Sequence, residues 1–155
     1  MPLLKAADQA LLREELKNMT NPVKLVFFSQ ALDCEGCPIT KQILEEVVAL
    51  SDKLELETYN FAIDKEVVQR YGIARIPAVA VVRVEVREQE GGPQQSVEHD
   101  YGIRFYGIPS GYEFMSLVGD IMDVSNGDSG LSEESKMLLL NVKQPVHFQV
   151  FTTPT

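Results

Sequence analysis

The chain has 155 residues, of which 45% are hydrophobic, and it carries a net charge of −9. This hydrophobic content can form a packed core, which excludes an intrinsically disordered chain, and the acidic balance excludes nonspecific binding to nucleic acid or to an anionic membrane surface. No apolar run approaches the roughly 20 residues that a membrane-spanning helix needs, and the N-terminal residues lack the apolar core of a secretory signal. We therefore expect a cytoplasmic protein.

The first half of the chain alternates between helical and strand patterns. Apolar residues at helical spacing predict a helix over residues 4–19, and a β-branched and aromatic run over residues 23–29 predicts a buried strand. A second amphipathic helix follows over residues 39–50, then a strand over residues 54–62. A short helix, which Asp64 caps and Gly72 closes, ends this half.

The second half begins with a strand over residues 78–87. Its first five positions are all apolar, which is typical of a strand covered on both faces. A turn at residues 90–93 leads to a hairpin partner over residues 96–106, and a helix runs from residue 109 to 124. This order of elements predicts an α/β fold with a central mixed β-sheet flanked by helices.

The two cysteines, Cys34 and Cys37, form a CxxC motif around Glu35 and Gly36, and Pro38 follows. The motif lies between a predicted strand and a predicted helix, where the positive end of the helix dipole favours thiolate over thiol. The spacing also lets the two sulfur atoms meet in an exchangeable disulfide. A CxxC motif near a βαβ pattern is a thioredoxin-like signal, so the sequence predicts a redox-active dithiol.

Three other interpretations of the motif stay open. A purely structural disulfide is one, although a three-residue loop constrains the unfolded chain little. A zinc site normally needs four ligands, and the two histidines, His99 and His147, lie on predicted strands far from the motif. An iron–sulfur cluster would need ligands from elsewhere. We expect no metal and no cofactor.

Charged residues surround the first cysteine. Asp33 and Glu35 flank Cys34, and Lys41 lies about one turn down the predicted helix. Negative charge close to a thiolate disfavours it, which would leave the reduced form less stable and the disulfide comparatively hard to reduce. The alternative is that both carboxylates are solvated and screened.

Ile76-Pro77 precedes the apolar strand at residue 78. Cis peptide bonds are essentially confined to positions before proline. A cis bond here would turn the backbone of Ile76 toward the CxxC motif, where it could pair with an extended substrate chain. The alternative is an ordinary trans proline at the start of a strand.

The C-terminal part contains a second copy of an earlier pattern. After a linker-like stretch, residues 132–142 predict a helix and residues 145–152 a strand. Residues 144–152 echo residues 21–29 at an offset of 123 (145 minus 22). Similarity at a fixed offset indicates a duplicated unit, and the alternative is a chance strand after a chance helix.

We therefore expect a domain over residues 1–126, a linker over 127–131, and the start of a second, truncated unit over 132–155, as if the chain were cut in mid-domain. An apolar strand without neighbours invites pairing with another chain. The C-terminal segment is thus expected either to dock on the sheet of the first unit or to mediate self-association, and we favour self-association.

Four stretches together resemble the glutaredoxin-like protein disulfide oxidoreductases of archaea and thermophilic bacteria, which consist of two tandem thioredoxin-fold units. The stretches are residues 27–37, 71–78, 103–114 and 120–125. The likeness covers nearly the whole chain. The chain departs from the family pattern in three places. The second unit is missing beyond its first strand, the hairpin around Gly91-Gly92 is long, and the two residues between the cysteines are Glu and Gly.

The resemblance implies a thioredoxin-like fold, with Cys34 as the nucleophile, Cys37 as the resolving thiol and Pro77 as a cis-proline beside them. The positions expected to bind substrate are Ile76, Pro77, Glu35 and Gly36. The leading function is thiol–disulfide exchange with protein substrates, in which Cys34 attacks a substrate disulfide and Cys37 resolves the mixed disulfide.

Two other functions compete with this one. The first is an electron-relay module for a dedicated reductase or peroxidase partner, comparable to the amino-terminal domain of alkyl hydroperoxide reductase flavoproteins. The second is a non-catalytic thioredoxin-fold interaction domain. Candidate partners are protein disulfide substrates and a thioredoxin-reductase-like flavoprotein.

Overall fold

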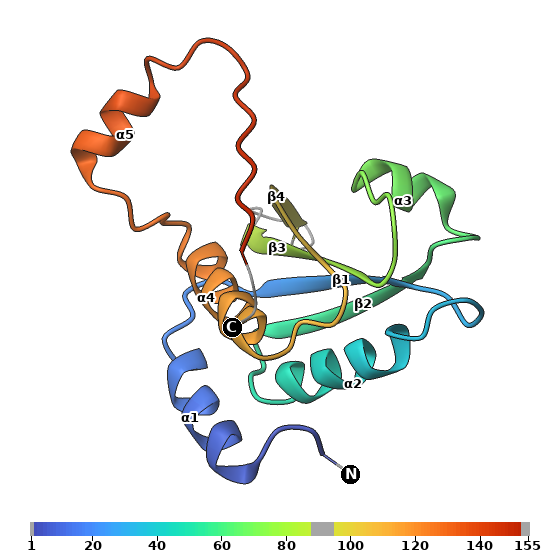
Figure 1. The fold of residues 1–155 in the computed structure, drawn as a ribbon. Helices are drawn as coiled ribbons and strands as arrows, with labels where there is room; N and C mark the ends of the chain where they lie inside the picture. Colours follow the sequence, from blue (N-terminus) through green and yellow to red (C-terminus); the bar gives the residue numbers. More distant parts are fainter. Residues whose placement is uncertain (1, 88–94, 153–155) are drawn as a thin grey trace.

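A computed structural model describes residues 2–87 and 95–152 of the chain (Figure 1). The elements in chain order are α1 (Ala6–Leu16), β1 (Val23–Ser29), α2 (Cys37–Val48), β2 (Leu54–Asn60), α3 (Lys65–Arg70), β3 (Ala78–Arg87), β4 (Gln95–Tyr106), α4 (Tyr112–Asn126) and α5 (Glu133–Leu139). The turn expected at residues 90–93 lies outside the described residues.

The four strands form one mixed sheet in the order β2-β1-β3-β4. β1 runs parallel to β2, with Val23 opposite Leu54, and antiparallel to β3. β3 and β4 pair antiparallel, with a register shift between Ala80 and Val82. The parallel pair has α2 between its strands, which is the crossover that parallel strands require.

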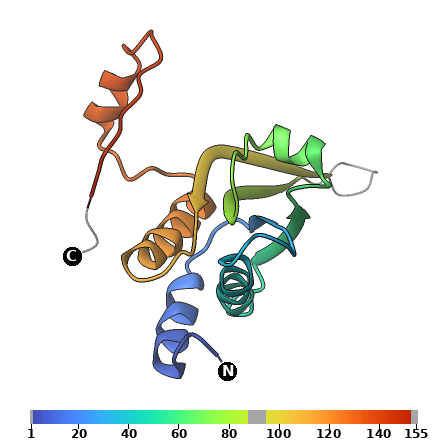
Figure 2. The same ribbon diagram turned by 45° about the vertical axis from the view of Figure 1, so that its right-hand side comes forward.

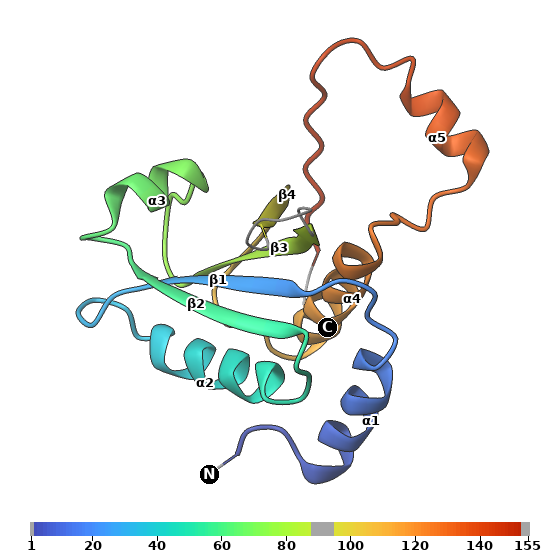
Figure 3. The same cartoon turned by 180° about the vertical axis from the view of Figure 1, so that it is seen from behind.

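Helices cover both faces of the sheet (Figures 1 and 3). Alternate residues of β1 point to opposite faces, so Leu25 and Phe27 pack in the core cluster with α1, α2 and α4, whereas Val26 and Phe28 pack in a second cluster with α3. All four side chains are fully buried. Burial on both faces explains why this strand is apolar at almost every position.

The C-terminal segment differs from its expected structure. The predicted helix over residues 132–142 forms as the shorter α5, whose N-terminus Ser132 caps by accepting a hydrogen bond from the Ser135 N–H at 3.2 Å. Residues 145–152, predicted as a strand, form no helix or strand. Figures 1 and 2 show α5 and the following residues as an arm that extends away from the sheet.

The arm exposes its apolar side chains, among them Phe148 and Val150 at 84% and 83%. A strand needs a neighbouring strand to satisfy its backbone groups, and no described strand lies beside this segment. The strand predicted for residues 145–152 therefore does not form, because the segment has no strand to pair with among the described residues. The boundaries of the proposed second unit stay a prediction.

Among the described helices, none has the length and apolar character to cross a membrane.

Candidate functional site: the Cys34–Cys37 disulfide

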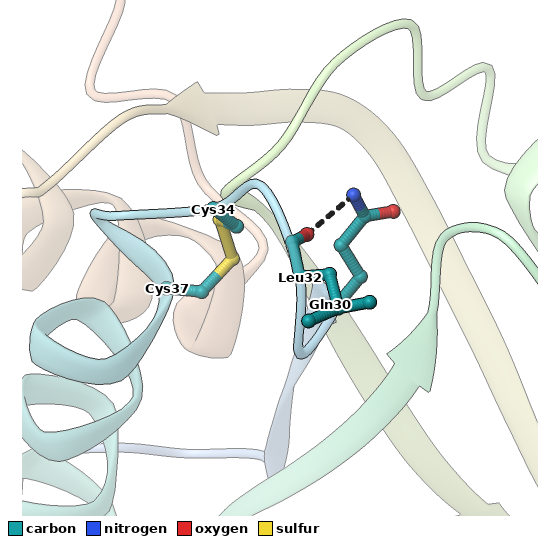
Figure 4. Close-up of a disulfide and its surroundings, with 4 residues drawn as sticks. All are labelled: Gln30, Leu32, Cys34 and Cys37. Atoms are coloured by element: carbon teal, nitrogen blue, oxygen red, sulfur yellow. Dashed lines mark hydrogen bonds between the residues drawn. A yellow bond between two sulfur atoms is a disulfide. The ribbon is translucent and has the colours of Figure 1, made fainter.

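The loop between β1 and α2 holds the two cysteines. The side-chain amide of Gln30 donates a hydrogen bond to the Leu32 carbonyl at 2.6 Å and so tightens the loop (Figure 4). Asp33 adopts a left-handed backbone conformation with φ of 57°, which aspartate tolerates better than most residues. This turn places Cys34 three residues before the start of α2.

Cys34 and Cys37 are joined by a disulfide with a Cα–Cα distance of 5.4 Å (Figure 4). The helix α2 begins at Cys37, two residues before the predicted start at residue 39, and the Cys37 N–H donates to the Cys34 carbonyl at 3.2 Å. Cys34 is half-buried, whereas Cys37 is only 4% exposed. Cys34 is thus the more accessible of the two cysteines.

Two loops distant in sequence meet the CxxC motif at Gly36. The Ile76-Pro77 peptide bond is cis. A Cβ atom at Gly36 would lie 3.4 Å from Pro77 Cγ and 3.3 Å from Ile108 Cγ1, so both side chains lie directly against this glycine. The Pro77 carbonyl accepts a hydrogen bond from Gly107 N–H at 2.9 Å, which ties the two loops together.

The backbone of Ile76 is free to bind another chain. Its side chain packs against both core clusters, yet no described residue hydrogen bonds its N–H or C=O. An extended polypeptide can therefore pair with Ile76 in the way that a strand adds to a sheet edge. Of the four positions expected to bind substrate, the structure brings Gly36, Ile76 and Pro77 together, and Glu35 lies exposed in the adjoining turn.

Sequence reasoning missed the contribution of the β4–α4 loop. Ile108, 37% exposed, adds an apolar side chain to the surface beside the disulfide, and Leu32 is 77% exposed in the β1–α2 loop. Ile108 belongs to the stretch 103–114 that carried the family resemblance, but nothing in the sequence placed it against Gly36. Its position depends on the pairing of β3 with β4.

The charges at the site are unevenly placed. Asp33 and Glu35 are exposed. Lys41 pairs with Glu45 at 3.6 Å, so the expected nearby cation already has a partner. The guanidinium of Arg75 lies 4.7 Å from the centre of the Tyr106 ring, and it makes no ion pair with any described residue.

A cavity of about 540 Å³ opens beside Cys37, between α2 and the ends of β1 and β2. Its lining includes Lys41, Tyr59, Asn60 and Asp64. The Tyr59 hydroxyl donates to Glu57, and this hydrogen bond raises the pKa of Tyr59. Cys37 therefore lies between the apolar core and a cavity that has both apolar and polar residues in its lining.

The two histidines lie elsewhere. His99 Nε2 is 2.8 Å from Glu85 Oε2 on the β3–β4 hairpin, and His147 is exposed in the arm. In the part of the chain that the structure describes, no three His, Cys, Asp or Glu side chains gather as a metal site would require.

The structure superposes on a protein disulfide oxidoreductase from Aeropyrum pernix K1 with a TM-score of 0.72 and 27% sequence identity. The fold is thioredoxin-like. The match covers 90% of this chain and 55% of that chain. The predicted fold class and the predicted resemblance to archaeal protein disulfide oxidoreductases are confirmed.

Two further proteins are similar to this thioredoxin-like chain. The NTD_N/C domain of alkylhydroperoxide reductase AhpF from Enterococcus faecalis V583 matches with a TM-score of 0.72 and 26% identity, over 88% of this chain and 60% of that one. A probable thioredoxin from Methanothermobacter thermautotrophicus is 25% identical over 91 residues, which are 58% of this chain and 86% of that protein. No protein-family model matches the chain. The chain spans only 55% and 60% of the two solved chains.

Proposed function

We propose that this protein is a thiol–disulfide oxidoreductase that exchanges its Cys34–Cys37 pair with protein disulfides. The observation that carries the proposal is the disulfide itself, whose more exposed cysteine, Cys34, lies in the same loop as Gly36, the residue that meets the cis Pro77. The similarity to a protein disulfide oxidoreductase of the same fold supports it.

In the proposed reaction, the Cys34 thiolate attacks a substrate disulfide, and one substrate sulfur leaves with the electron pair and takes a proton from solvent. The Cys37 thiolate then attacks Cys34 in the mixed disulfide. The Cys34–Cys37 bond forms, the bond to the substrate breaks, and the second substrate sulfur leaves and is protonated. The substrate gains two electrons and two protons, and the dithiol loses them.

In this proposal the surrounding residues have different tasks. The substrate main chain pairs with Ile76, while Gly36, Pro77 and Ile108 provide a flat apolar surface for the residues that flank the substrate cysteine. Gly36 has no side chain, which lets the substrate sulfur approach Cys34. Candidate partners are protein disulfides and a thioredoxin-reductase-like flavoprotein, and the cytoplasmic location expected from the sequence stays a prediction.

Reduction of insulin by dithiothreitol tests the proposal. The protein should accelerate the reaction, and Cys34→Ser should abolish the acceleration because it removes the attacking sulfur. Cys37→Ser should accumulate mixed disulfides with substrate, since nothing resolves them. A wild-type protein that gives no acceleration would favour a structural disulfide, and trapping by Cys34→Ser instead of Cys37→Ser would reverse the two roles.

The similarity to the AhpF domain favours one second candidate, an electron-relay module that serves a dedicated partner. A relay should accept electrons rapidly from a thioredoxin-reductase-like flavoprotein yet reduce insulin no faster than dithiothreitol alone. A general oxidoreductase should accelerate insulin reduction with dithiothreitol as the sole electron donor.

A further inference from the structure

The hydroxyl of Thr40 is buried and has no hydrogen-bond partner among the described residues. The residue is fully buried, and its backbone N–H already donates to the Gly36 carbonyl at 3.0 Å. Most buried polar side-chain atoms in proteins are hydrogen-bonded, and leaving one unpaired costs free energy. A valine would fill the same space without this cost, so the hydroxyl calls for a physical explanation.

Ser125, the other fully buried polar residue of the described chain, shows the usual arrangement. Its hydroxyl donates to the Asn21 carbonyl at 2.6 Å and accepts from the Asn21 N–H at 3.1 Å. The unpaired hydroxyl of Thr40 is therefore a property of its location and not of buried hydroxyls in this fold.

Thr40 lies one helical turn after Cys37 on the buried stripe of α2, which continues with Leu44 and Val47. Residues three apart on a helix are neighbours on one face, and their Cα–Cβ bonds tilt toward the helix N-terminus. The side chain of Thr40 therefore leans toward the turn that holds Cys37. Both residues are shielded from solvent.

In the oxidised state, the Thr40 hydroxyl makes no hydrogen bond to the Cys37 sulfur. The disulfide bond fixes the position of this sulfur, and reduction leaves the Cys37 side chain able to rotate about its Cα–Cβ bond. Once the disulfide is reduced, this sulfur must become a thiolate to resolve a mixed disulfide, and burial against the apolar cluster disfavours that charge. The cluster on one side of Cys37 consists of apolar side chains. On the other side, Lys41 and Asp64 line the cavity beside it, and Lys41 is already paired with Glu45.

We propose that Thr40 is a positioning residue whose hydroxyl donates a hydrogen bond to the Cys37 sulfur in the reduced protein and stabilises its thiolate. The role of this hydrogen bond in resolving mixed disulfides rests on the proposed exchange function. The hydrogen bond itself requires only that the two cysteines can be reduced. Thr40 keeps its proton throughout. Because the bond exists only after reduction, it favours the dithiol and makes the disulfide easier to reduce.

Two substitutions separate the hydroxyl from the shape of the side chain. Thr40→Val keeps the volume and removes the donor, whereas Thr40→Ser keeps the donor. The equilibrium of each protein with reduced and oxidised dithiothreitol is measured above the Cys37 pKa, where the sulfur is charged. Thr40→Val should shift this equilibrium about tenfold toward the disulfide, which corresponds to a reduction potential about 30 mV more negative. Thr40→Ser should stay close to wild type.

The Cys37 thiol is also titrated directly by thiolate absorbance in a Cys34→Ser background, where it is the only thiol. Thr40→Val should raise its pKa. In urea unfolding, Thr40→Val should leave the oxidised protein as stable as wild type or more stable, and should destabilise the reduced protein. Ser125→Ala, the matched control, should destabilise both redox states equally.

An unchanged dithiothreitol equilibrium and an unchanged Cys37 pKa in Thr40→Val would overturn the proposal, as would Thr40→Ser behaving like Thr40→Val. These measurements need no protein substrate. Failure of the wild-type protein to reduce insulin would therefore count against the proposed function alone, whereas a missing redox shift would count against the role of Thr40 alone.

Discussion

Replacing Gly36 by alanine should disturb the point where the CxxC motif meets the two neighbouring loops. The backbone at Gly36 has φ of −79° and ψ of −15°, which alanine adopts without strain, so the effect comes from the added methyl group and from the helix cap. The new Cβ would lie 3.3 Å from Ile108 Cγ1 and 3.4 Å from Pro77 Cγ. These contacts are tight but not impossible, and Ile108 must move by a few tenths of an ångström.

The expected cost has two parts. Alanine is a poorer N-cap than glycine, by roughly 0.5 kcal/mol, and the tight contact adds about 1 kcal/mol, as mild overpacking does. The lower conformational entropy of alanine in the unfolded chain offsets about 0.5 kcal/mol of this cost. Gly36→Ala should therefore lower the free energy of unfolding by about 1 kcal/mol, or about 2–4 °C in melting temperature for a chain of this size. Insulin reduction should fall as well, because the methyl group occupies the surface beside Cys34.

Urea unfolding and a double-mutant cycle with Ile108→Ala test this reasoning. Ile108→Ala removes the atoms that the methyl group meets, so the double variant should recover about 0.5 kcal/mol relative to additivity. Gly119→Ala, in α4 with open space around it, is the matched control and should stabilise the protein by about 0.5–1 kcal/mol. A Gly36→Ala protein as stable as wild type, with no coupling to Ile108→Ala, would refute the packing argument.

Three further changes test the electrostatics and the arm. Glu35→Gln removes a negative charge next to Cys34 and should lower the Cys34 pKa by about half a unit, or roughly 0.7 kcal/mol. Thiolate absorbance followed against pH measures this pKa, and an unchanged or higher value would contradict the prediction. The Arg104 guanidinium forms two hydrogen bonds with the Asp100 carboxylate and lowers its pKa. Because the pKa of Asp100 is lower in the folded protein than in the unfolded chain, its ion pair stabilises the fold above the unfolded pKa near 4, and this stabilisation is lost as the pH falls through the folded pKa. Asp100→Asn should therefore lower the free energy of unfolding by about 1 kcal/mol at neutral pH and leave it unchanged in strong acid. Urea unfolding at both pH values measures this, and an equal effect at the two values would show that the ion pair does not contribute. Phe148→Asp should abolish self-association in light scattering if the arm mediates it, and monomers in both the wild type and the variant would show that the arm plays no such part.

Much of the fold follows from local patterns. The uninterrupted apolar runs of β1 and β3 predicted strands covered on both faces, and the two core clusters show why: successive residues of β1 face α2 on one side and α3 on the other. The CxxC spacing and its place between a strand and a helix predicted the redox pair, because that chemistry depends on four consecutive residues. These features are local, so one sequence was enough to infer them.

The same local reasoning failed where an element needs a partner. Residues 145–152 have nearly the pattern of β1, yet they form no strand. β1 is a strand because β2 and β3 complete its hydrogen bonds on either side, and no described strand does this for the arm. Period and composition indicate what a segment can form, and its neighbours decide whether it forms.

The sequence by itself determined the chemistry of this protein, namely two cysteines three positions apart at the entry to a helix and a proline before a buried strand. Only the tertiary structure decided how that chemistry is surrounded. It placed Ile108 against Gly36 and Pro77, left the backbone of Ile76 open, and enclosed Thr40 without a partner one turn from Cys37. The reason is that these relations join segments separated by tens of residues, and the pairing of β1, β3 and β4 fixes them through a register that no local pattern specifies.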